Sequence, residues 1–248
     1  DLEKKDLNNY RKLAQLIFQD PYAALSPRMT VRDIIAEPLE VMGLTQTREE
    51  TDERVREIAA KCRLNLEHLR RFPHAFSGGQ RQRISIARAL VCNPNFVVAD
   101  ESVAALDVSI QADILNLLLS LQNQLGLTFL FISHDLSVVA HICDHVAVMY
   151  LGTLVESAPT RKLFDNPRHP YTKALLSAIP SLDPDDSGKA QKLEGEIPSP
   201  VNPPSGCRFH TRCHFAEERC RKEVPEWRKL DKRHSVACHF AEKFTSTQ

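Results

Sequence analysis

The chain has 248 residues, 42% of them hydrophobic, and its 32 Lys and Arg residues balance 32 Asp and Glu residues to give a formal net charge of zero. This length allows one large domain, or one domain with a small appendage, and the balanced charge argues against the broad basic surface of a nucleic-acid-binding protein. No run approaches about 18 consecutive apolar residues and the first residues are charged, so we expect a cytoplasmic chain that reaches a membrane only through a partner.

The first third of the chain predicts one strand and then helices. A short buried strand is expected within Lys12–Asp20, where Pro21 ends it and Gln19 lies at its exit. The pattern from Thr30 to Arg71 is helical, and its Glu/Arg pairs suit an exposed helix face. We interpret this region as part of a helical insertion over about residues 29–85.

The middle of the chain predicts a parallel sheet. A helix that starts near Gly79 ends at Asn93–Pro94, and FVVAD (96–100) follows as a near-continuous apolar run, typical of a parallel strand covered on both faces. A long helix closed by Gly126 leads to a second buried strand, LTFLFIS (127–133). This strand–helix–strand order predicts an α/β fold.

The last part of the chain changes character. A short helix precedes two predicted edge strands that turn at Leu151–Gly152. Residues 181–206 are rich in Pro, Gly and Asp and lack apolar periodicity, so we interpret them as a linker along the surface. A small module is expected from Cys207 onward.

Polar side chains follow both buried strands. Asp100 and Glu101 lie at the carboxyl end of the first strand, where ligands bind in open α/β sheets, and His134 lies at the tip of the second. Adjacent carboxylates can divide the hydrolysis of a phosphoanhydride, one holding Mg²⁺ and the other polarising the attacking water. His134 is placed to sense a terminal phosphate.

The segment FSGGQRQRISIARAL (Phe76–Leu90) predicts an anion site at a helix N-terminus. Ser77 is a favourable N-cap, and Gly78 and Gly79 leave backbone amides open to a phosphate. A nucleotide site normally also needs a GxxxxGK[ST] loop, and none occurs in the 248 residues.

In their order along the chain, these motifs closely resemble the ATP-binding-cassette (ABC) ATPases over about residues 12–160. The resemblance implies that Gln19 is the Q-loop glutamine, Ser77, Gly78, Gly79 and Gln80 the signature motif, Asp100 and Glu101 the Walker B pair, Ala104 to Asp107 the D-loop, and His134 the switch histidine. It further implies catalytic roles for Glu101, His134 and Gln19, with Mg²⁺ on Asp100. Ser77, Gly78, Gly79, Gln80, Asp100 and Asp107 would contact ATP, which in this family is sandwiched between two head-to-tail subunits.

The two ends of the chain narrow the resemblance. IFQDPYAALSPRMTV, HPYTKALLSAIP and PPSGCRFHTRCHFAEERC are similar to the ATP-binding subunits of dipeptide and oligopeptide importers. The fold implied is a P-loop NTPase-like α/β sheet with a helical insertion, incomplete at its N-terminus because the Walker A part is missing, plus a small cysteine module. The implied domains are 1–159 for the ATPase, 160–206 for a C-terminal extension and linker, and 207–248 for the module.

Seven cysteines divide into two groups. Cys62, Cys92 and Cys143 lie among apolar or helical residues and are expected to act as small buried hydrophobic residues. The other four lie within the last 42 residues, at Cys207, Cys213, Cys220 and Cys238. Their wide spacing lacks the CxxC pairs typical of structural zinc, and the resemblance favours an iron–sulfur cluster, with zinc or no metal as alternatives.

Two functions remain open from the sequence. The first is an ATP-hydrolysing subunit that powers peptide import at the cytoplasmic face of the inner membrane. Its partners would be a second ATP-binding subunit, identical or different, transmembrane permease subunits and, indirectly, a peptide-binding protein. The second is a non-catalytic partner that supplies its signature motif to another subunit's ATP site. Without a Walker A motif, the chain alone is expected to be inactive.

Overall fold

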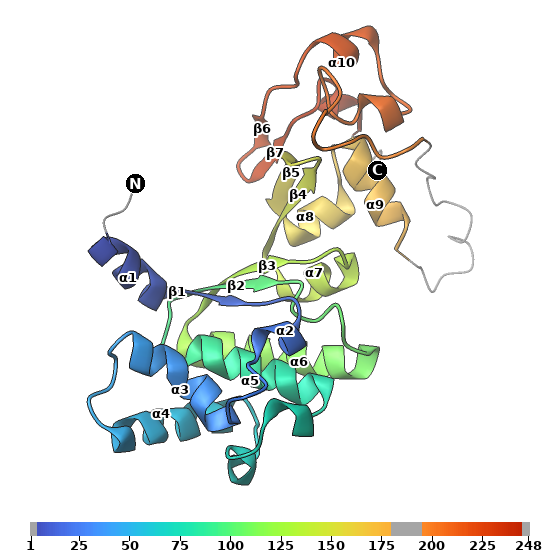
Figure 1. Cartoon of the computed structure of the whole chain (residues 1–248). Coiled ribbons are helices and arrows are strands. Elements are labelled where there is room, and N and C mark those ends of the chain that lie inside the picture. The colour runs from blue at the N-terminus through green and yellow to red at the C-terminus, as the bar shows by residue number, and fades with distance from the viewer. Residues whose placement is uncertain (1–3, 180–194, 245–248) are drawn as a thin grey trace. The chain divides into compact units, whose positions relative to one another are not determined.

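The computed structural model describes residues 4–179 and 195–244, and its contacts divide the chain into two compact units. The N-terminal unit spans Asp1–Asp135 and the C-terminal unit spans Leu136–Gln248 (Figure 1). Most of the predicted linker over residues 181–206 lies outside the described residues. Within the part of the chain that is described, no helix is long and apolar enough to cross a membrane.

The N-terminal unit contains a parallel sheet and several helices. Its elements are α1 (Lys4–Leu13), β1 (Ala14–Ile17), α2 (Pro21–Ala24), α3 (Val31–Val41), α4 (Arg48–Lys61), the 3-10 turns η1 (Leu66–His68) and η2 (Pro73–Ala75), α5 (Gly78–Leu90), β2 (Phe96–Asp100), α6 (Val108–Leu125) and β3 (Thr128–Ile132). The predicted first strand is shorter than expected, because α1 continues to Leu13. Gly126 ends α6 in the left-handed conformation with φ of 65°, which confirms the predicted C-cap.

The three strands form a parallel sheet in the order β1-β2-β3. The register aligns Leu16, Val98 and Leu130 across the three strands, so these side chains share one face. This arrangement confirms the predicted strand–helix–strand unit and places the carboxyl ends of all three strands at one edge.

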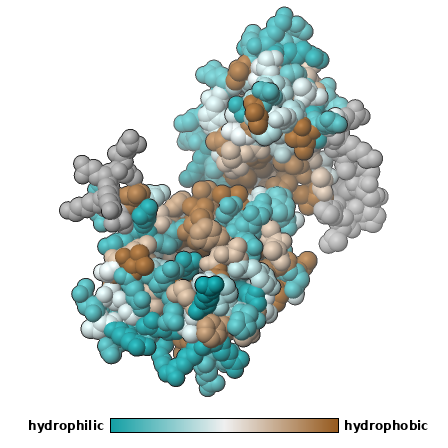
Figure 2. All heavy atoms as spheres, viewed as in Figure 1, coloured by the Kyte–Doolittle hydropathy of each residue, from teal (hydrophilic) through white to brown (hydrophobic). Residues whose placement is uncertain are grey.

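Only one face of this sheet is covered by the described residues. Ile17, Val97 and Ala99 are fully buried on the face against which α5 and α6 lie (Figure 1). The apolar side chains on the other face are 39–49% exposed, namely those of Leu16, Phe18, Leu130 and Ile132. Figure 2 shows this apolar surface over the strands. The prediction of strands covered on both faces is therefore wrong for the described part of the N-terminal unit, where the apolar side chains of the second face remain exposed.

The predicted helical region forms α3 and α4, and each begins at a threonine cap. Thr30 Oγ1 accepts a hydrogen bond from the backbone N–H of Asp33, and Thr47 Oγ1 accepts one from Glu50. These side chains satisfy amides that would otherwise lack an intrahelical partner. The sequence therefore starts both helices at defined residues.

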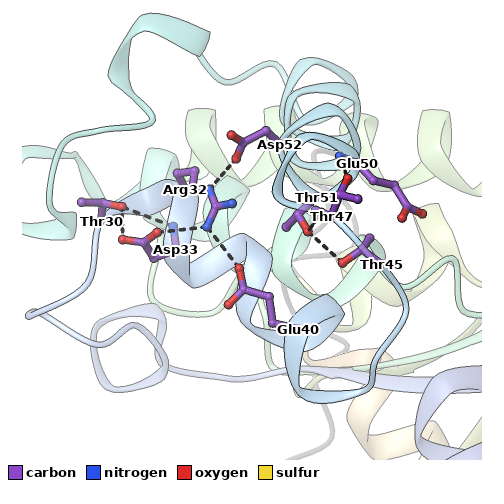
Figure 3. A network of polar contacts seen from close by, with 9 residues as sticks. All are labelled: Thr30, Arg32, Asp33, Glu40, Thr45, Thr47, Glu50, Thr51 and Asp52. Carbon is purple, nitrogen blue, oxygen red and sulfur yellow. Dashed lines mark hydrogen bonds and ion pairs between the residues drawn. The ribbon is translucent and has the colours of Figure 1, made fainter.

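Arg32 ties α3 to α4 through a network of carboxylates (Figure 3). Its Nε donates to Asp52 at 2.6 Å, and its Nη1 donates to Asp33 and to Glu40 at 3.2 Å each. Only 18% of the Arg32 side chain is exposed, so solvent screens these contacts less than it screens ordinary surface pairs. The network fixes the two helices that neighbour α5.

The C-terminal unit is built on an antiparallel sheet. Its elements are α7 (Leu136–Ile142), β4 (His145–Tyr150), β5 (Thr153–Pro159), α8 (Thr160–Asp165), α9 (Pro170–Ser177), the 3-10 turn η4 (His210–Arg212), α10 (Glu218–Lys222), β6 (Arg228–Asp231), β7 (His234–Val236) and the 3-10 turn η5 (Ala241–Phe244). The predicted turn between β4 and β5 is confirmed, with φ of 44° at Leu151 and 77° at Gly152.

In this sheet the strand order is β4-β5-β7-β6. The sheet therefore joins β5 and β7, which the sequence predicted to lie in different domains. β5 pairs with β7, so that Glu156 lies opposite Val236. The unit boundary after Asp135 and this shared sheet differ from the predicted boundaries at residues 159 and 207. Such pairing depends on contacts about 80 residues apart, which local patterns do not encode.

A buried carboxylate helps to hold this unit together. Glu156 accepts hydrogen bonds from the backbone N–H of Arg168 at 2.6 Å, from that of His169 at 2.9 Å, and from His234 Nε2 at 2.7 Å. Glu156 and His234 are 0% and 1% exposed. Three donors offset the cost of burying the carboxylate and connect β5, β7 and the start of α9.

Candidate functional site

Three of the predicted site residues meet at the carboxyl edge of the parallel sheet. Gln19 follows β1, Glu101 follows β2 and His134 follows β3. Gln19 Nε2 donates to Glu101 Oε2 at 2.7 Å, and His134 Nδ1 lies 3.0 Å from Glu101 Oε1. Each carboxylate oxygen of Glu101 therefore has one polar partner from a neighbouring strand end.

The backbone of Glu101 holds this carboxylate in place. Its φ is 43°, a left-handed conformation that costs a non-glycine residue about 1–3 kcal/mol. Its N–H donates to the carbonyl of Ile132, and its own carbonyl accepts from Ala104, at 2.9 and 3.0 Å. Because these bonds fix the turn, the carboxylate stays at the sheet edge.

The same edge is open to a ligand. The Glu101 side chain is 27% exposed and that of His134 is 71% exposed. A carboxylate in this position can accept a proton from a water molecule that attacks a bound substrate. Gln19 and His134 can orient that carboxylate and the substrate.

Asp100 is suited to hold a divalent cation beside Glu101. It is the last residue of β2, pairs in register with Ile132 of β3, and is half-buried. Mg²⁺ prefers carboxylate oxygens and keeps several waters, so one strand-end aspartate beside a second carboxylate fits its chemistry.

The predicted capping of α5 is present. Ser77 Oγ accepts from the backbone N–H of Gln80 at 3.4 Å, and Gln80 Oε1 accepts from the N–H of Ser77 at 3.0 Å. This capping box gives the Gln80 side chain a structural task. The amides of Gly78 and Gly79 belong to the first turn, whose N–H groups have no partner within the helix and can face an anion.

The two glycines of this segment have different surroundings. A Cβ on Gly79 would lie 2.5 Å from Ile110 Cγ2 of α6, whereas a Cβ on Gly78 would come no closer than 3.6 Å to Leu106. Gly79 is therefore required for the packing of α5 on α6. Packing does not require a glycine at position 78, and the access that Gly78 gives to a phosphate remains the reason for a glycine there.

Asp107 caps α6. Its Oδ1 accepts from the backbone N–H of Ile110 at 3.1 Å and from Ser109 Oγ at 2.8 Å. The hydrogen bond from the Ile110 amide, followed in importance by that from the Ser109 hydroxyl, holds the pKa of the Asp107 carboxyl below its usual value. A structural role thus stands beside its predicted nucleotide contact.

The structure does not bring all the predicted site residues together. Among the described residues, no hydrogen bond joins Gln19, Glu101 or His134 to the segment Ser77–Gln80. This separation within one chain is compatible with a site completed by a second subunit.

The four clustered cysteines line one small cavity of about 20 Å³ in the C-terminal unit. The lining consists of Cys207, Cys213, Cys220 and Cys238 together with His169, Pro170, Phe209, His210, Phe215, His239, Phe240 and Phe244. Gly206 allows the close approach of two of these segments, because its Cβ position is 2.4 Å from the carbonyl oxygen of Cys220. The fold therefore gathers thiols that are widely spaced in sequence.

Burial keeps two of these thiols protonated. Burial first, with a smaller contribution from neighbouring cysteines of the set, raises the pKa of Cys238 to about 12 and that of Cys213 to about 11. Among the described residues, no group of three or more His, Cys, Asp and Glu side chains is arranged to hold a metal ion. The cavity therefore has the thiol donors of a metal–thiolate site, but these side chains are not arranged around a single metal ion.

Sequence patterns did not indicate two sets of residues that organise the C-terminal unit and the signature region. His169 Nδ1 accepts from the backbone N–H of Tyr171 and so caps α9, with Pro170 as its first residue. The His-Pro pair before a helical pattern was a usable signal for this cap. No local signal pointed to the buried contacts of Glu156, or to the Arg81 guanidinium, which lies 4.1 Å from the centre of the Tyr22 ring.

Two family models match the chain. The ABC transporter model matches residues 1–104, and the model of the oligopeptide/dipeptide transporter C-terminal region matches residues 155–220. These regions include Gln19, the signature segment and Glu101 in the first match, and Glu156 and three of the clustered cysteines in the second.

Curated relatives are similar over almost the whole chain. It is 51% identical over 241 residues to the di/tripeptide transport ATP-binding protein DppF of Pseudomonas aeruginosa, covering 97% of this chain and 74% of that protein. It is 52% identical over 240 residues to the oligopeptide transport ATP-binding protein AppF of Bacillus subtilis, with 96% and 73% covered.

Solved structures share the fold at lower identity. CbiO1 from Clostridium perfringens, part of an ABC transporter complex, aligns with a TM-score of 0.60 and 27% identity over 66% of this chain and 64% of that one. The ATP-binding cassette MJ0796, dimeric and bound to ADP and Pi, aligns with a TM-score of 0.56 and 28% identity over 65% and 69%.

Proposed function

The chain belongs to the family of ATP-binding subunits of dipeptide and oligopeptide ABC transporters, and from this premise we propose that it hydrolyses ATP to power peptide import. It acts as a peripheral subunit at the cytoplasmic face of the membrane. It pairs with a second ATP-binding subunit and with transmembrane permease subunits, and a peptide-binding protein delivers the cargo to them.

The observation that carries this proposal is the contact of Glu101 with Gln19 and His134. In the reaction, the Glu101 carboxylate accepts a proton from the attacking water, while Gln19 and His134 orient the water and the terminal phosphate. Asp100 would hold Mg²⁺, which supplies charge stabilisation for the transferred phosphoryl group. This constellation favours the hydrolytic subunit over the non-catalytic alternative.

The signature segment serves the other half of the site. The first amides of α5 and its dipole favour the negative charge of a phosphate, and Ser77 fixes where that helix begins. Because this segment shares no hydrogen bond with the Glu101 site of its own chain, we infer that it faces nucleotide bound to the second subunit.

A groove in the N-terminal unit suits the permease partner. Its volume is about 510 Å³, and its walls come from α1, from β1 and the residue after it, from α3 with its C-cap, and from α5. Phe18 and Val41, two of the lining residues, are 47% and 79% exposed. Exposed apolar side chains around a concave surface favour contact with another protein.

Replacement of Glu101 by Gln tests the hydrolytic role. The amide keeps the shape of the side chain but does not accept a proton, so in the assembled transporter we expect the hydrolysis rate to fall by about 10²–10⁴-fold. Binding of labelled ATP should remain, because the substitution removes no phosphate contact. Steady-state hydrolysis close to that of the unmodified transporter would refute this role of Glu101.

We further propose that the four clustered cysteines hold an iron–sulfur cluster. Four thiols that face one cavity, with an apolar and aromatic lining, provide the donor set of such a cluster. Metal binding would replace the protons that burial now retains on Cys213 and Cys238. A cluster spreads its four thiolates over several iron atoms, so it does not require them to converge on one ion.

Anaerobic purification tests this assignment. We expect a brown protein with broad absorption at the blue end of the visible spectrum and comparable amounts of iron and sulfide. The matched control is Cys62→Ser, which removes a buried thiol outside the cavity and should leave the iron content unchanged. A colourless protein, with or without zinc, would rule out the cluster.

A further inference from the structure

Three short segments around the cysteine cavity repeat one pattern. Each places a phenylalanine two residues after a cysteine, as CRF (207–209), CHF (213–215) and CHF (238–240). Two of them extend the likeness, because CHFAEE (213–218) and CHFAEK (238–243) are identical at five of six positions. The three cysteines and the three phenylalanines of these Cys-x-Phe segments all line the cavity. The repeat is therefore a property of the cavity wall.

Each Cys-x-Phe segment directs a backbone amide at its own sulfur. Burial raises the pKa of the three thiols, and a hydrogen bond from the amide of the phenylalanine is the largest effect that opposes this rise. Such a hydrogen bond favours the thiolate, which is the form that binds a metal. Hydrogen bonds to cysteine sulfurs also help to set the reduction potential of an iron–sulfur cluster. Each segment thus supplies a thiol together with a donor for its thiolate.

Packing of the aromatic rings does not by itself explain the repeat. Phe209 is 2% exposed and its ring packs on those of Tyr150 and Tyr171, whereas Phe215 is 47% exposed. A common role in the core would require similar burial. The features that the three segments share are the amide at the sulfur and the position on the cavity wall.

Cys220 has a different setting from the other three cysteines. It lies in α10 (Figure 1), and the residue two positions later is Lys222, whose side chain is 71% exposed and whose Nζ lies 2.9 Å from a carboxylate oxygen of Glu218. In an α-helix an N–H bonds to the carbonyl four residues before it, so the amide of Lys222 is engaged in the helix. Cys220 therefore has neither the phenylalanine nor the amide of a Cys-x-Phe segment.

The attachment of α10 to the cavity does not depend on the Cys220 thiol. The carbonyl of Cys220 accepts from the backbone N–H of Cys207 at 2.8 Å, and Ser205 Oγ donates to the carbonyl of Arg221 at 3.0 Å. Both bonds use backbone carbonyls of the α10 segment, so they remain when the thiol is removed. The other three cysteines then keep their positions.

We propose that the three Cys-x-Phe cysteines are the fixed ligands of the proposed iron–sulfur cluster and that Cys220 is an exchangeable one. This inference rests on the proposed cluster. Each fixed position combines a thiolate with an amide that stabilises it, whereas the fourth position offers a thiolate without that donor. The thiolate of a small monothiol can therefore replace Cys220 while the cluster stays in the cavity.

Replacement of each cysteine by alanine, in the full chain purified anaerobically, tests this difference. Cys207→Ala, Cys213→Ala and Cys238→Ala should each lower the iron and sulfide content by about tenfold or more, because a fixed ligand is lost. Cys220→Ala should keep most of its iron, and mercaptoethanol in the buffer should raise its content to that of the unmodified protein. The same monothiol should not restore the other three variants.

A pair of variants at Phe215 tests the amide itself. Phe215→Pro removes the N–H that donates to the Cys213 sulfur, whereas Phe215→Leu keeps it. We expect Phe215→Leu to match the unmodified protein, and Phe215→Pro to bind less iron and to have a more negative reduction potential, because the lost hydrogen bond stabilised negative charge on the sulfur. Equal potentials for the two variants would show that this amide does not distinguish the fixed positions.

The unfolding midpoints of the iron-free cysteine variants show whether lost iron reflects a lost fold. Where alanine lowers the midpoint, serine at the same position is the second replacement, and the cysteine series decides the inference even if Phe215→Pro does not fold. Equal loss of iron in all four alanine variants, or rescue of all four by the monothiol, would overturn the inference and leave the cluster in place. An unmodified protein without iron would overturn both.

Discussion

The two candidate sites of this chain are built in opposite ways. The Glu101 site lies on an open sheet edge, where polar side chains from three strand ends contact each other and remain partly exposed. The cysteine cavity is lined in part by aromatic side chains, and burial raises the pKa of two of its thiols, Cys213 and Cys238. The Glu101 site can bind a ligand directly from solvent, whereas burial in the cysteine cavity favours the unligated state with protonated Cys213 and Cys238.

This difference has a physical consequence for each site. At the open edge, a substrate replaces water around groups that already face it, and little of the fold has to change. In the cavity, the proposed metal group would have to displace protons and gather thiolates, and its binding to the folded state alone would stabilise the C-terminal unit. We expect substitutions at the open edge to change activity, and substitutions near the cavity to change stability.

The largest expected effect on stability compares two glycines with nearly the same backbone. Gly206 and Gly126 have φ of 66° and 65°, but a Cβ on Gly206 would lie 2.4 Å from the Cys220 carbonyl oxygen, whereas nothing lies within 4 Å of one on Gly126. Gly126→Ala should cost about 1 kcal/mol from backbone strain alone, and Gly206→Ala about 4 kcal/mol because a backbone clash is added. Denaturant unfolding of the two variants measures both values. Equal losses would mean that the cavity is no more tightly packed than a helix end.

A smaller effect distinguishes the two signature glycines. Gly79→Ala should destabilise the N-terminal unit by about 2 kcal/mol, because the new methyl group overpacks the contact with Ile110. Gly78→Ala meets ordinary van der Waals distances and should leave stability almost unchanged. Thermal unfolding of both variants is the measurement. A stable Gly79→Ala variant would show that α5 and α6 adjust freely.

The smallest effect concerns a buried histidine and uses pH. Burial lowers the pKa of His169 to about 3, whereas the same group in the unfolded chain titrates near 6.5. The unfolded state therefore binds the proton first, and stability must fall as the pH drops through the unfolded pKa toward the folded one. The loss should be about 1.3 kcal/mol at about pH 5.5, relative to neutral pH.

The matched variant for this prediction is His169→Asn. Asparagine can still cap α9 but does not titrate, so the variant should show a flatter pH dependence even if it is less stable overall. Chemical denaturation of both proteins between neutral and mildly acidic pH gives the slopes. Parallel slopes would contradict a buried neutral His169.

Local sequence patterns determined a large part of this protein. The apolar runs at Ala14–Ile17, Phe96–Asp100 and Thr128–Ile132 form strands, and the caps at Ser77 and Gly126 bound helices where the sequence predicted them. Order and spacing of short motifs were enough to indicate the family, because each motif requires particular residue types at a strand end or helix start.

Only the tertiary structure decided which of these residues meet. It brought Gln19 and His134 to the two oxygens of Glu101, and it left one face of the parallel sheet uncovered by the described residues. It also paired β5 with β7 and buried Glu156 against His234 across the predicted domain boundaries. The physical reason is that periodicity and capping act over a few residues, whereas these contacts join positions 33 to 82 residues apart in the chain, where only the packed fold sets the distance.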